Sequence, residues 1–259
     1  MKLLFTNDDS IESVFLHELV RAFQQTGEHE IFVVAPKQEQ SWIGAAKSRH
    51  RPVHSTKGDR GLNCPTWIVD GTPSDSVNIA IAHLLPCRPD AVISGINVGL
   101  NASLGFVLAS GTIAGAWEGA VHGLPAYALS QDINPDTFDR LKSEGGKPDE
   151  TLLTTLKASA ARAAKIIPPL IASAVPQSFV VHNFNFPYPC GQDTDIRSTV
   201  PARVIIPGLF SPADDDGTHR FVFKLGADVS PATGPLTDRA ALKAGQISHT
   251  VLDYTKLGM

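Results

Sequence analysis

Residues 2–10 read KLLFTNDDS, and this stretch decides the fold. Residues 2–6 form a short apolar run without polar alternation, which predicts a strand buried on both faces, as in a parallel sheet. Helical spacing of apolar residues follows over residues 13–25, and a second buried strand is expected over residues 30–35 (EIFVVA), where Pro36 ends it. A strand, a helix and a second strand in this order predict a βαβ unit.

The same alternation continues through the first half of the chain. Pro73 and Ser74 start an expected helix over 74–85, and Pro86 stops it. A strand over 90–94, a helix over 112–122 and a strand over 126–130 come next. We therefore predict an α/β fold with a Rossmann-like, doubly wound and mostly parallel sheet.

The second half of the chain has a less regular pattern. Residues 134–148 are polar and contain glycines, which favours a surface loop. An Ala-rich helix is expected from residue 149 to 167, where Pro168 and Pro169 would end it. The later expectations are strands over 179–184, 202–206 and 220–225 with a turn at 214–217, a capped helix over 237–244 and a strand over 246–252.

These patterns favour one domain over residues 1–259, without a linker. Its core would comprise roughly residues 1–183 and 237–259, and residues 184–236 would form a C-terminal β-hairpin arm.

Composition excludes several classes of protein. The 259 residues carry 22 Lys and Arg against 26 Asp and Glu, a net charge of −4, so we expect no nucleic-acid polymer as partner. The sequence holds no apolar run of membrane-spanning length, so no membrane partner is expected. The short apolar stretch at the N-terminus does not fit a signal peptide, which favours the cytoplasm. The three cysteines are widely spaced and are expected to be reduced thiols.

The sharpest local feature is the pair Asp8 and Asp9, directly after the first strand. In an open α/β sheet, ligands bind beyond the carboxyl ends of the strands. Adjacent carboxylates repel each other unless a cation or a donor lies between them, and oxygen ligands of this kind suit Mg²⁺ or Mn²⁺. The alternative is that Asp9 or Ser10 merely caps the following helix.

Other polar residues follow the ends of neighbouring elements. Ser41 follows the second strand, where its hydroxyl could bind a metal or a phosphate oxygen or could simply belong to a turn. Asn97 and Asn101 lie in a Gly/Asn-rich segment that either approaches a ligand or forms a turn. Ser110-Gly111-Thr112 opens a helix whose N-terminus suits a phosphate, although Ser110 or Thr112 could act only as a cap.

Three aromatic residues near these motifs each have two possible roles. Trp42, Phe106 and Trp117 could stack on a nucleobase, whereas packing in the core or at its rim is the more ordinary role for each.

Taken together and in order, these motifs resemble the SurE family of survival nucleotidases. The matching stretches are LLFTNDD (3–9), IFVVAP (31–36), VDGTPSDSV (69–77), VISGINVGLN (92–101) and SGTIAGAWEG (110–119). The resemblance implies a metal-dependent phosphomonoesterase, a 5′-nucleotidase acting on nucleoside 5′- and 3′-monophosphates, and an arm that assembles a homodimer or homotetramer.

The resemblance also implies the roles of individual residues. One divalent cation per subunit, Mg²⁺ or Mn²⁺, would be held by Asp8, Asp9, Ser41 and Asn97, and Asp8 and Asp9 would be catalytic. The phosphate would face Asn97, Asn101, Ser110, Gly111 and Thr112.

The chain departs from the family's pattern at three places. Ser10 replaces a glycine, residues 11–15 lack an Ala-Pro-Gly segment, and residues 106–109 (FVLA) lack an acidic residue. Two alternatives therefore stay open: a non-catalytic nucleotide-binding or assembly protein on the same fold, and a phosphatase for another phosphomonoester or for short polyphosphate.

Overall fold

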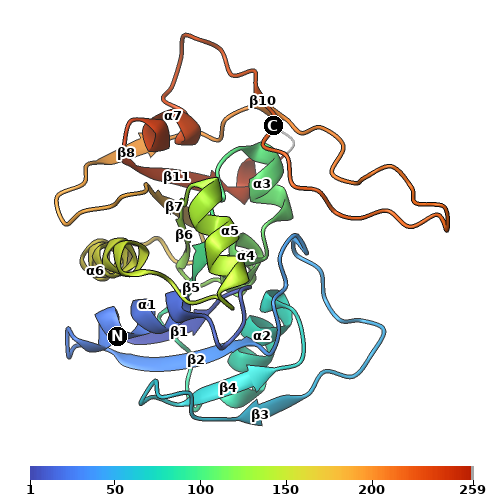
Figure 1. The fold of residues 1–259 in the computed structure, drawn as a ribbon. Coiled ribbons are helices and arrows are strands. Elements are labelled where there is room, and N and C mark those ends of the chain that lie inside the picture. The colour runs from blue at the N-terminus through green and yellow to red at the C-terminus, as the bar shows by residue number, and fades with distance from the viewer. Residues whose placement is uncertain (258–259) are drawn as a thin grey trace.

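A computed structural model describes residues 1–257 and shows a nine-stranded sheet with helices on both faces (Figure 1). The strand order is β3-β4-β2-β1-β5-β6-β7-β11-β8. The first half contains β1 (Lys2–Thr6), α1 (Val14–Gln24), β2 (Glu30–Pro36), β3 (Ser55–Lys57), β4 (Thr66–Val69), α2 (Pro73–Ile79), β5 (Ala91–Val98), α3 (Leu104–Ala109), α4 (Gly111–Val121) and β6 (Ala126–Gln131). The second half contains α5 (Pro135–Ser143), α6 (Glu150–Ala172), β7 (Val180–Phe186), β8 (Ile196–Thr199), β9 (Val204–Ile205), β10 (Ala227–Asp228), α7 (Asp238–Lys243) and β11 (Ile247–Asp253).

The sheet is doubly wound around β1, which confirms the predicted fold class. β1 pairs in parallel with β2 on one side and with β5 on the other. The chain runs outward from β1 to β2 and β4, then crosses back to β5 and continues to β6 and β7. The winding therefore reverses between β1 and β5, and the carboxyl ends of these two strands flank the place where such folds bind ligands.

Alternate residues of the central strands enter cores on opposite faces. Leu3 and Phe5 pack with α1 and α6 on one face, whereas Leu4 packs with α2 on the other. α4 covers β6 on the same side as α2, and α2 contacts α4. Burial on both faces explains why these strands are apolar without alternation.

Three expectations about helices are wrong. Residues 134–148 are not all loop, because Asn134 caps α5 by accepting a hydrogen bond from the Thr137 N–H at 2.8 Å. The helix expected to stop at residue 167 continues to Ala172 with Pro168 and Pro169 inside it, since Leu170 and Ile171 still pack on the core. The helix expected over 74–85 is α helical only to Ile79 and continues as a wider π turn over Ala80–Leu84.

The C-terminal region adds the last two strands at one edge of the sheet. β11 runs antiparallel to β7, and β8 pairs in parallel with β11 as the edge strand. The hairpin is present as the antiparallel pair β9 and β10, from which a long loop extends to the right in Figure 1. The strand expected over 220–225 is not formed; a single bridge between Phe210 and Phe221 stands there instead.

Besides α5, five short strands and α-helices within residues 1–257 escaped the sequence analysis: β3, β4, β8, β10 and α3. Each has six residues or fewer, too short for a periodic pattern to be recognised.

Within residues 1–257, no helix is long and apolar enough to cross a membrane.

Candidate active site

Asp8 is buried and held by contacts on two sides. Its carboxylate Oδ1 accepts a hydrogen bond from the Thr112 hydroxyl at 2.5 Å, and its carbonyl oxygen accepts one from the Gln40 N–H at 2.7 Å. A Cβ added to Gly111 would lie only 2.8 Å from the Asp8 Cβ and 2.9 Å from Asp8 Oδ2. The N-terminus of α4 is therefore packed directly against Asp8, and only glycine leaves room for this approach.

Asp9 links the two strands at the switch point. Its Oδ2 accepts a hydrogen bond from the Val98 N–H, at the end of β5, at 2.8 Å. Ser13 is the N-cap residue of α1, without a side-chain cap, so the alternative in which Asp9 or Ser10 caps that helix is wrong. Ser10 has a φ of +83°. The free-energy cost of this backbone conformation is higher for a residue with a side chain than for glycine.

The two carboxylates are electrostatically strained. Burial raises the pKa of Asp8 to about 6, even though the Thr112 hydrogen bond favours the charged form. Burial, together with the neighbouring Asp8 carboxylate, raises the pKa of Asp9 well above its usual range. Within residues 1–257, no lysine or arginine forms an ion pair with either group. A cation placed between them would relieve the repulsion.

Glu39 is a third acidic residue at this site, and the sequence analysis missed it. Its charge raises the pKa of both Asp8 and Asp9. Its Oε1 accepts a hydrogen bond from the Ser41 hydroxyl at 2.7 Å, so Ser41 is turned toward Glu39. Its position two residues before Ser41 could have indicated a role at the site. The neighbouring residues are also polar, however, so the sequence alone does not distinguish Glu39 from an ordinary loop residue.

Asn97 lies beside Val98 at the end of β5 and is buried. Its side-chain amide donates to the Gly99 carbonyl oxygen at 2.7 Å, which leaves its own side-chain oxygen available as a ligand. The strand that carries it is irregular between Ser94 and Asn97. Gly95 has a φ of +128°, and a side chain there would collide with the Leu129 carbonyl oxygen.

Asn101 is fixed by its neighbours. Its side-chain amide donates to the Ser130 hydroxyl at 2.9 Å, and its N–H donates to Oδ1 of Asn185 at 2.7 Å. Asn183 donates to the Asn101 carbonyl oxygen at 2.9 Å. The two β7 asparagines, missed by the sequence analysis, alternate with phenylalanines in NFNF (183–186), an unusual pattern for a buried strand.

Ser110 is the N-cap of α4. Its hydroxyl accepts a hydrogen bond from the Ile113 N–H at 3.1 Å, so the capping role holds. The helix N-terminus still lies against Asp8, where its N–H groups and positive dipole end favour an anion. Thr72 and Asp75 likewise form a capping box at α2.

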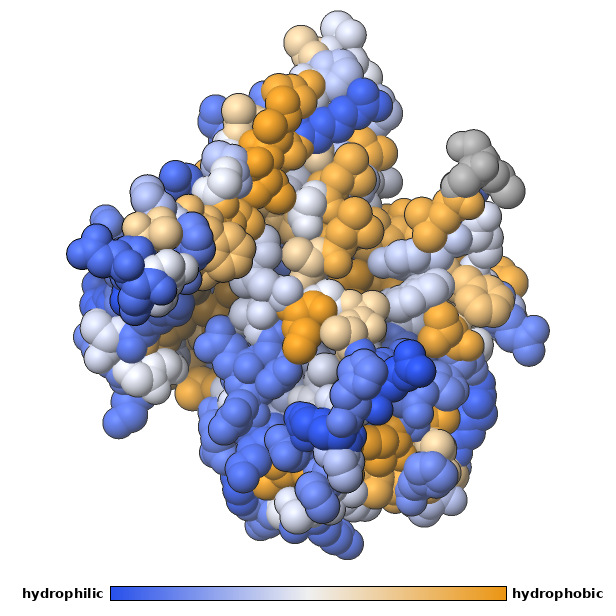
Figure 2. Space-filling view, turned by 90° about the vertical axis from the view of Figure 1, so that its right-hand side faces the viewer, coloured by the Kyte–Doolittle hydropathy of each residue, from blue (hydrophilic) through white to orange (hydrophobic). Residues whose placement is uncertain are grey.

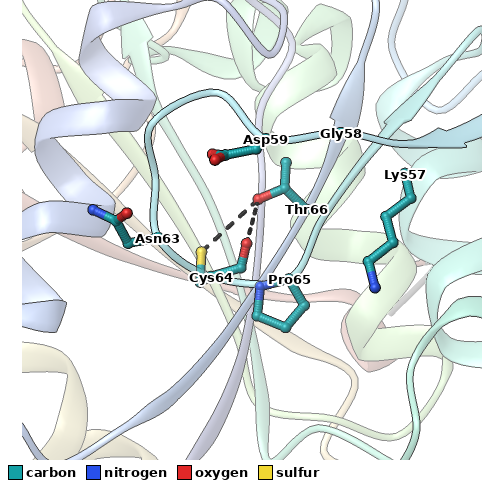
Figure 3. Close-up of a pocket in the computed structure, with 7 residues that line it drawn as sticks. All are labelled: Lys57, Gly58, Asp59, Asn63, Cys64, Pro65 and Thr66. Carbon is teal, nitrogen blue, oxygen red and sulfur yellow. Dashed lines mark hydrogen bonds between the residues drawn. The ribbon is translucent and has the colours of Figure 1, made fainter.

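A cavity is also present at another part of the molecule. It has a volume of about 620 Å³ and is lined by residues 57–59 and 63–66, shown in Figure 3. Thr66 begins β4, so this cavity opens at the amino ends of the parallel strands, opposite the Asp8 site. Within it, the Thr66 hydroxyl donates to the Cys64 carbonyl oxygen at 2.9 Å, a local turn contact.

The metal ligands implied by the resemblance include only two acidic residues. Within the described residues, no group of three or more His, Cys, Asp or Glu side chains is placed to hold a metal ion. A cation at this site would therefore need neutral oxygen ligands such as Asn97 and Ser41 beside the two aspartates.

The fold and the site together define a doubly wound α/β protein with an acidic site beside a helix N-terminus at the switch point of its sheet. The family model described as "Survival protein SurE" matches residues 3–205, and the chain belongs to the SurE family.

Relatives in other organisms carry the name 5′-nucleotidase SurE. The Maridesulfovibrio salexigens protein is 34% identical over 259 aligned residues, covering 98% of this chain and 93% of that protein. The Desulforudis audaxviator protein is 44% identical over 131 residues, half of each chain. The crystal structure of the Sure protein from Aquifex aeolicus matches with a TM-score of 0.73 and 24% identity, over 98% of this chain and 93% of that one, and supports the fold. Family and names together support a nucleotidase or phosphatase.

Proposed function

We propose that this chain is a divalent-metal-dependent 5′-nucleotidase that hydrolyses nucleoside 5′-monophosphates, and 3′-monophosphates as further substrates, to nucleoside and phosphate. The observation that carries the proposal is the carboxylate pair of buried Asp8 and half-buried Asp9 beside the N-terminus of α4. Two carboxylates that burial and repulsion destabilise favour a cation, and a helix N-terminus favours an anion.

The residues present fit a divalent cation of the Mg²⁺ or Mn²⁺ type. The donors are hard oxygen atoms from Asp8, Asp9, Asn97 and Ser41, the ligands such ions prefer. Oδ1 of Asn7 is a further buried acceptor, without a hydrogen-bond donor in the described part of the chain. The chemistry such a cation supplies is charge neutralisation on the phosphate and activation of an attacking water.

The chain's own residues orient and neutralise the substrate. Thr112 fixes one oxygen of Asp8, and the Val98 N–H fixes one oxygen of Asp9, so each carboxylate keeps a defined orientation. The N-terminus of α4 and the Asn97 and Asn101 amides supply donors that stabilise the equatorial oxygens of the phosphate in the transition state. The net reaction adds water across the ester P–O bond.

The test is phosphate release from a panel of substrates with Mn²⁺, Mg²⁺ or chelator. We expect release from nucleoside monophosphates with either metal and none with chelator. Retained nucleotide binding without turnover in any condition would favour a non-catalytic protein. Faster release from sugar phosphates or short polyphosphate would favour a different phosphatase.

We also propose that the arm assembles a homodimer or homotetramer. Ile205 and Phe210 are each 63% exposed, apolar surface that a second copy would cover. Light scattering of the wild type against an Ile205→Ser and Phe210→Ser double variant tests this; a monomeric wild type would contradict it.

A further inference from the structure

Trp42 lies on a short loop that is fixed to the candidate active site at both ends. The Gln40 N–H donates to the Asp8 carbonyl oxygen at 2.7 Å, and the Gly44 N–H donates to the carbonyl oxygen of Ala109, directly before Ser110, at 2.9 Å. Trp42 therefore lies between two anchors, one at the acidic pair and one at the start of α4. In Figure 1 this loop, after β2, rises toward α3.

Trp42 is the centre of an aromatic cluster made of Trp42, Phe106, Phe221 and Phe223. Its ring centroid lies 5.4 Å from Phe106, 5.2 Å from Phe221 and 6.2 Å from Phe223. Phe106 and Phe223 are 5.9 Å apart. The cluster joins three separate segments: the Trp42 loop, α3 and the arm.

The aromatic cluster is graded in exposure. Phe106, at the bottom of the cluster, is 6% exposed. Trp42 is 37% exposed, Phe221 46% and Phe223 55%. Neither Trp42 nor the two arm phenylalanines belong to the buried hydrophobic cores described above. Figure 2 views the side of the molecule that bears the arm and shows hydrophobic surface gathered in its upper half. Exposed rings resting on a buried ring provide a rigid surface that a flat ligand can cover.

We propose that the aromatic cluster is the platform on which the nucleobase of the substrate stacks while its phosphate lies against Asp8 and α4. This inference rests on the proposed function. Every nucleobase has a π face, so stacking binds all bases, and the larger purines cover more ring area than the pyrimidines. The platform thus selects nucleoside monophosphates, purines first, over phosphomonoesters without a base.

The kinetic test compares AMP with ribose 5-phosphate, the same phosphate ester without its base. Stacking on one aromatic side chain changes affinity by about 5- to 150-fold. We expect Trp42→Ala and Phe221→Ala to lower kcat/KM for AMP within this range, mainly through KM, and to leave kcat/KM for ribose 5-phosphate unchanged. Phe179→Ala is the control, because Phe179 is 38% exposed and lies outside the aromatic cluster. Equal losses on both substrates would overturn the proposal.

A second readout does not depend on turnover. AMP should quench the tryptophan fluorescence of the metal-free protein in a saturable titration, and ribose 5-phosphate should not. Trp42→Phe should abolish the quenching and keep most of the kcat/KM for AMP, because a ring remains. If the wild type hydrolyses neither substrate, the proposed function fails, and the presence or absence of this quenching still decides the platform. If Trp42→Ala changes the mass of the particle in solution, the rings are a contact between subunits and the proposal falls.

Discussion

Replacing Gly111 by alanine should damage catalysis far more than stability. The added Cβ would lie 2.8 Å from the Asp8 Cβ and 2.9 Å from both Asp8 Oδ2 and the Gln40 carbonyl oxygen. Carbon atoms pack at about 3.5–4.0 Å, so Asp8 or α4 must move by roughly 1 Å. A misplacement of this size costs about 100-fold in rate, or about 2.7 kcal/mol of transition-state stabilisation.

Stability should change much less in the same variant. Overpacking costs about 1–3 kcal/mol, whereas alanine favours a helix over glycine by about 1 kcal/mol, so the free energy of unfolding should fall by roughly 0–2 kcal/mol. The assays are kcat for phosphate release from AMP and urea unfolding of the same preparation. Gly191→Ala is the control, since its Cβ would meet only Thr194 Oγ1 at 3.7 Å. Unchanged kcat in Gly111→Ala would refute the close packing of α4 on Asp8 as a requirement for catalysis.

Three further variants test separate parts of the structure. Ser10→Gly should raise the free energy of unfolding by about 0.5–1 kcal/mol in urea, because relief of the positive φ outweighs the greater entropy of unfolded glycine; a loss of stability would contradict this. Thr112→Val should lower kcat by roughly 10- to 100-fold in the phosphate-release assay, since it removes the hydrogen bond to Asp8, and an effect below twofold would show that Asp8 needs no such support. In the folded chain, burial and, to a smaller extent, the nearby His182 lower the pKa of His249 from 6.5 to about 4. As the pH falls, His249 is therefore protonated in the unfolded chain before it is protonated in the folded chain. The contribution of His249 to stability should therefore be lost between pH 6.5 and 4, by about 2–3 kcal/mol at pH 4.5, and His249→Gln should remove that part of the pH dependence in denaturation curves at several pH values.

The first half of the fold could be predicted because the sequence patterns that indicate its strands and helices are local. β1, β2 and β6 are continuous apolar runs, and Pro73 marks the start of α2. The acidic pair was found for the same reason, since the end of a strand is visible in the sequence and its place at the sheet edge follows from the winding.

What escaped prediction depends on tertiary contacts. α6 passes through Pro168 and Pro169 because apolar residues beyond them still pack on the core, which outweighs the missing hydrogen bonds. Glu39 approaches Asp8 and Asp9 only because the loop after β2 folds back on β1. The aromatic cluster likewise unites residues about 180 positions apart, which no local pattern shows.

The most direct test is phosphate release from AMP by the wild type and by Asp8→Asn, each measured with chelator and after addition of Mn²⁺. We predict that the wild type is inactive with chelator and recovers with Mn²⁺, and that folded Asp8→Asn stays inactive in both conditions. Full activity of the chelator-treated wild type, or of Asp8→Asn, would contradict a cation held by Asp8 and Asp9.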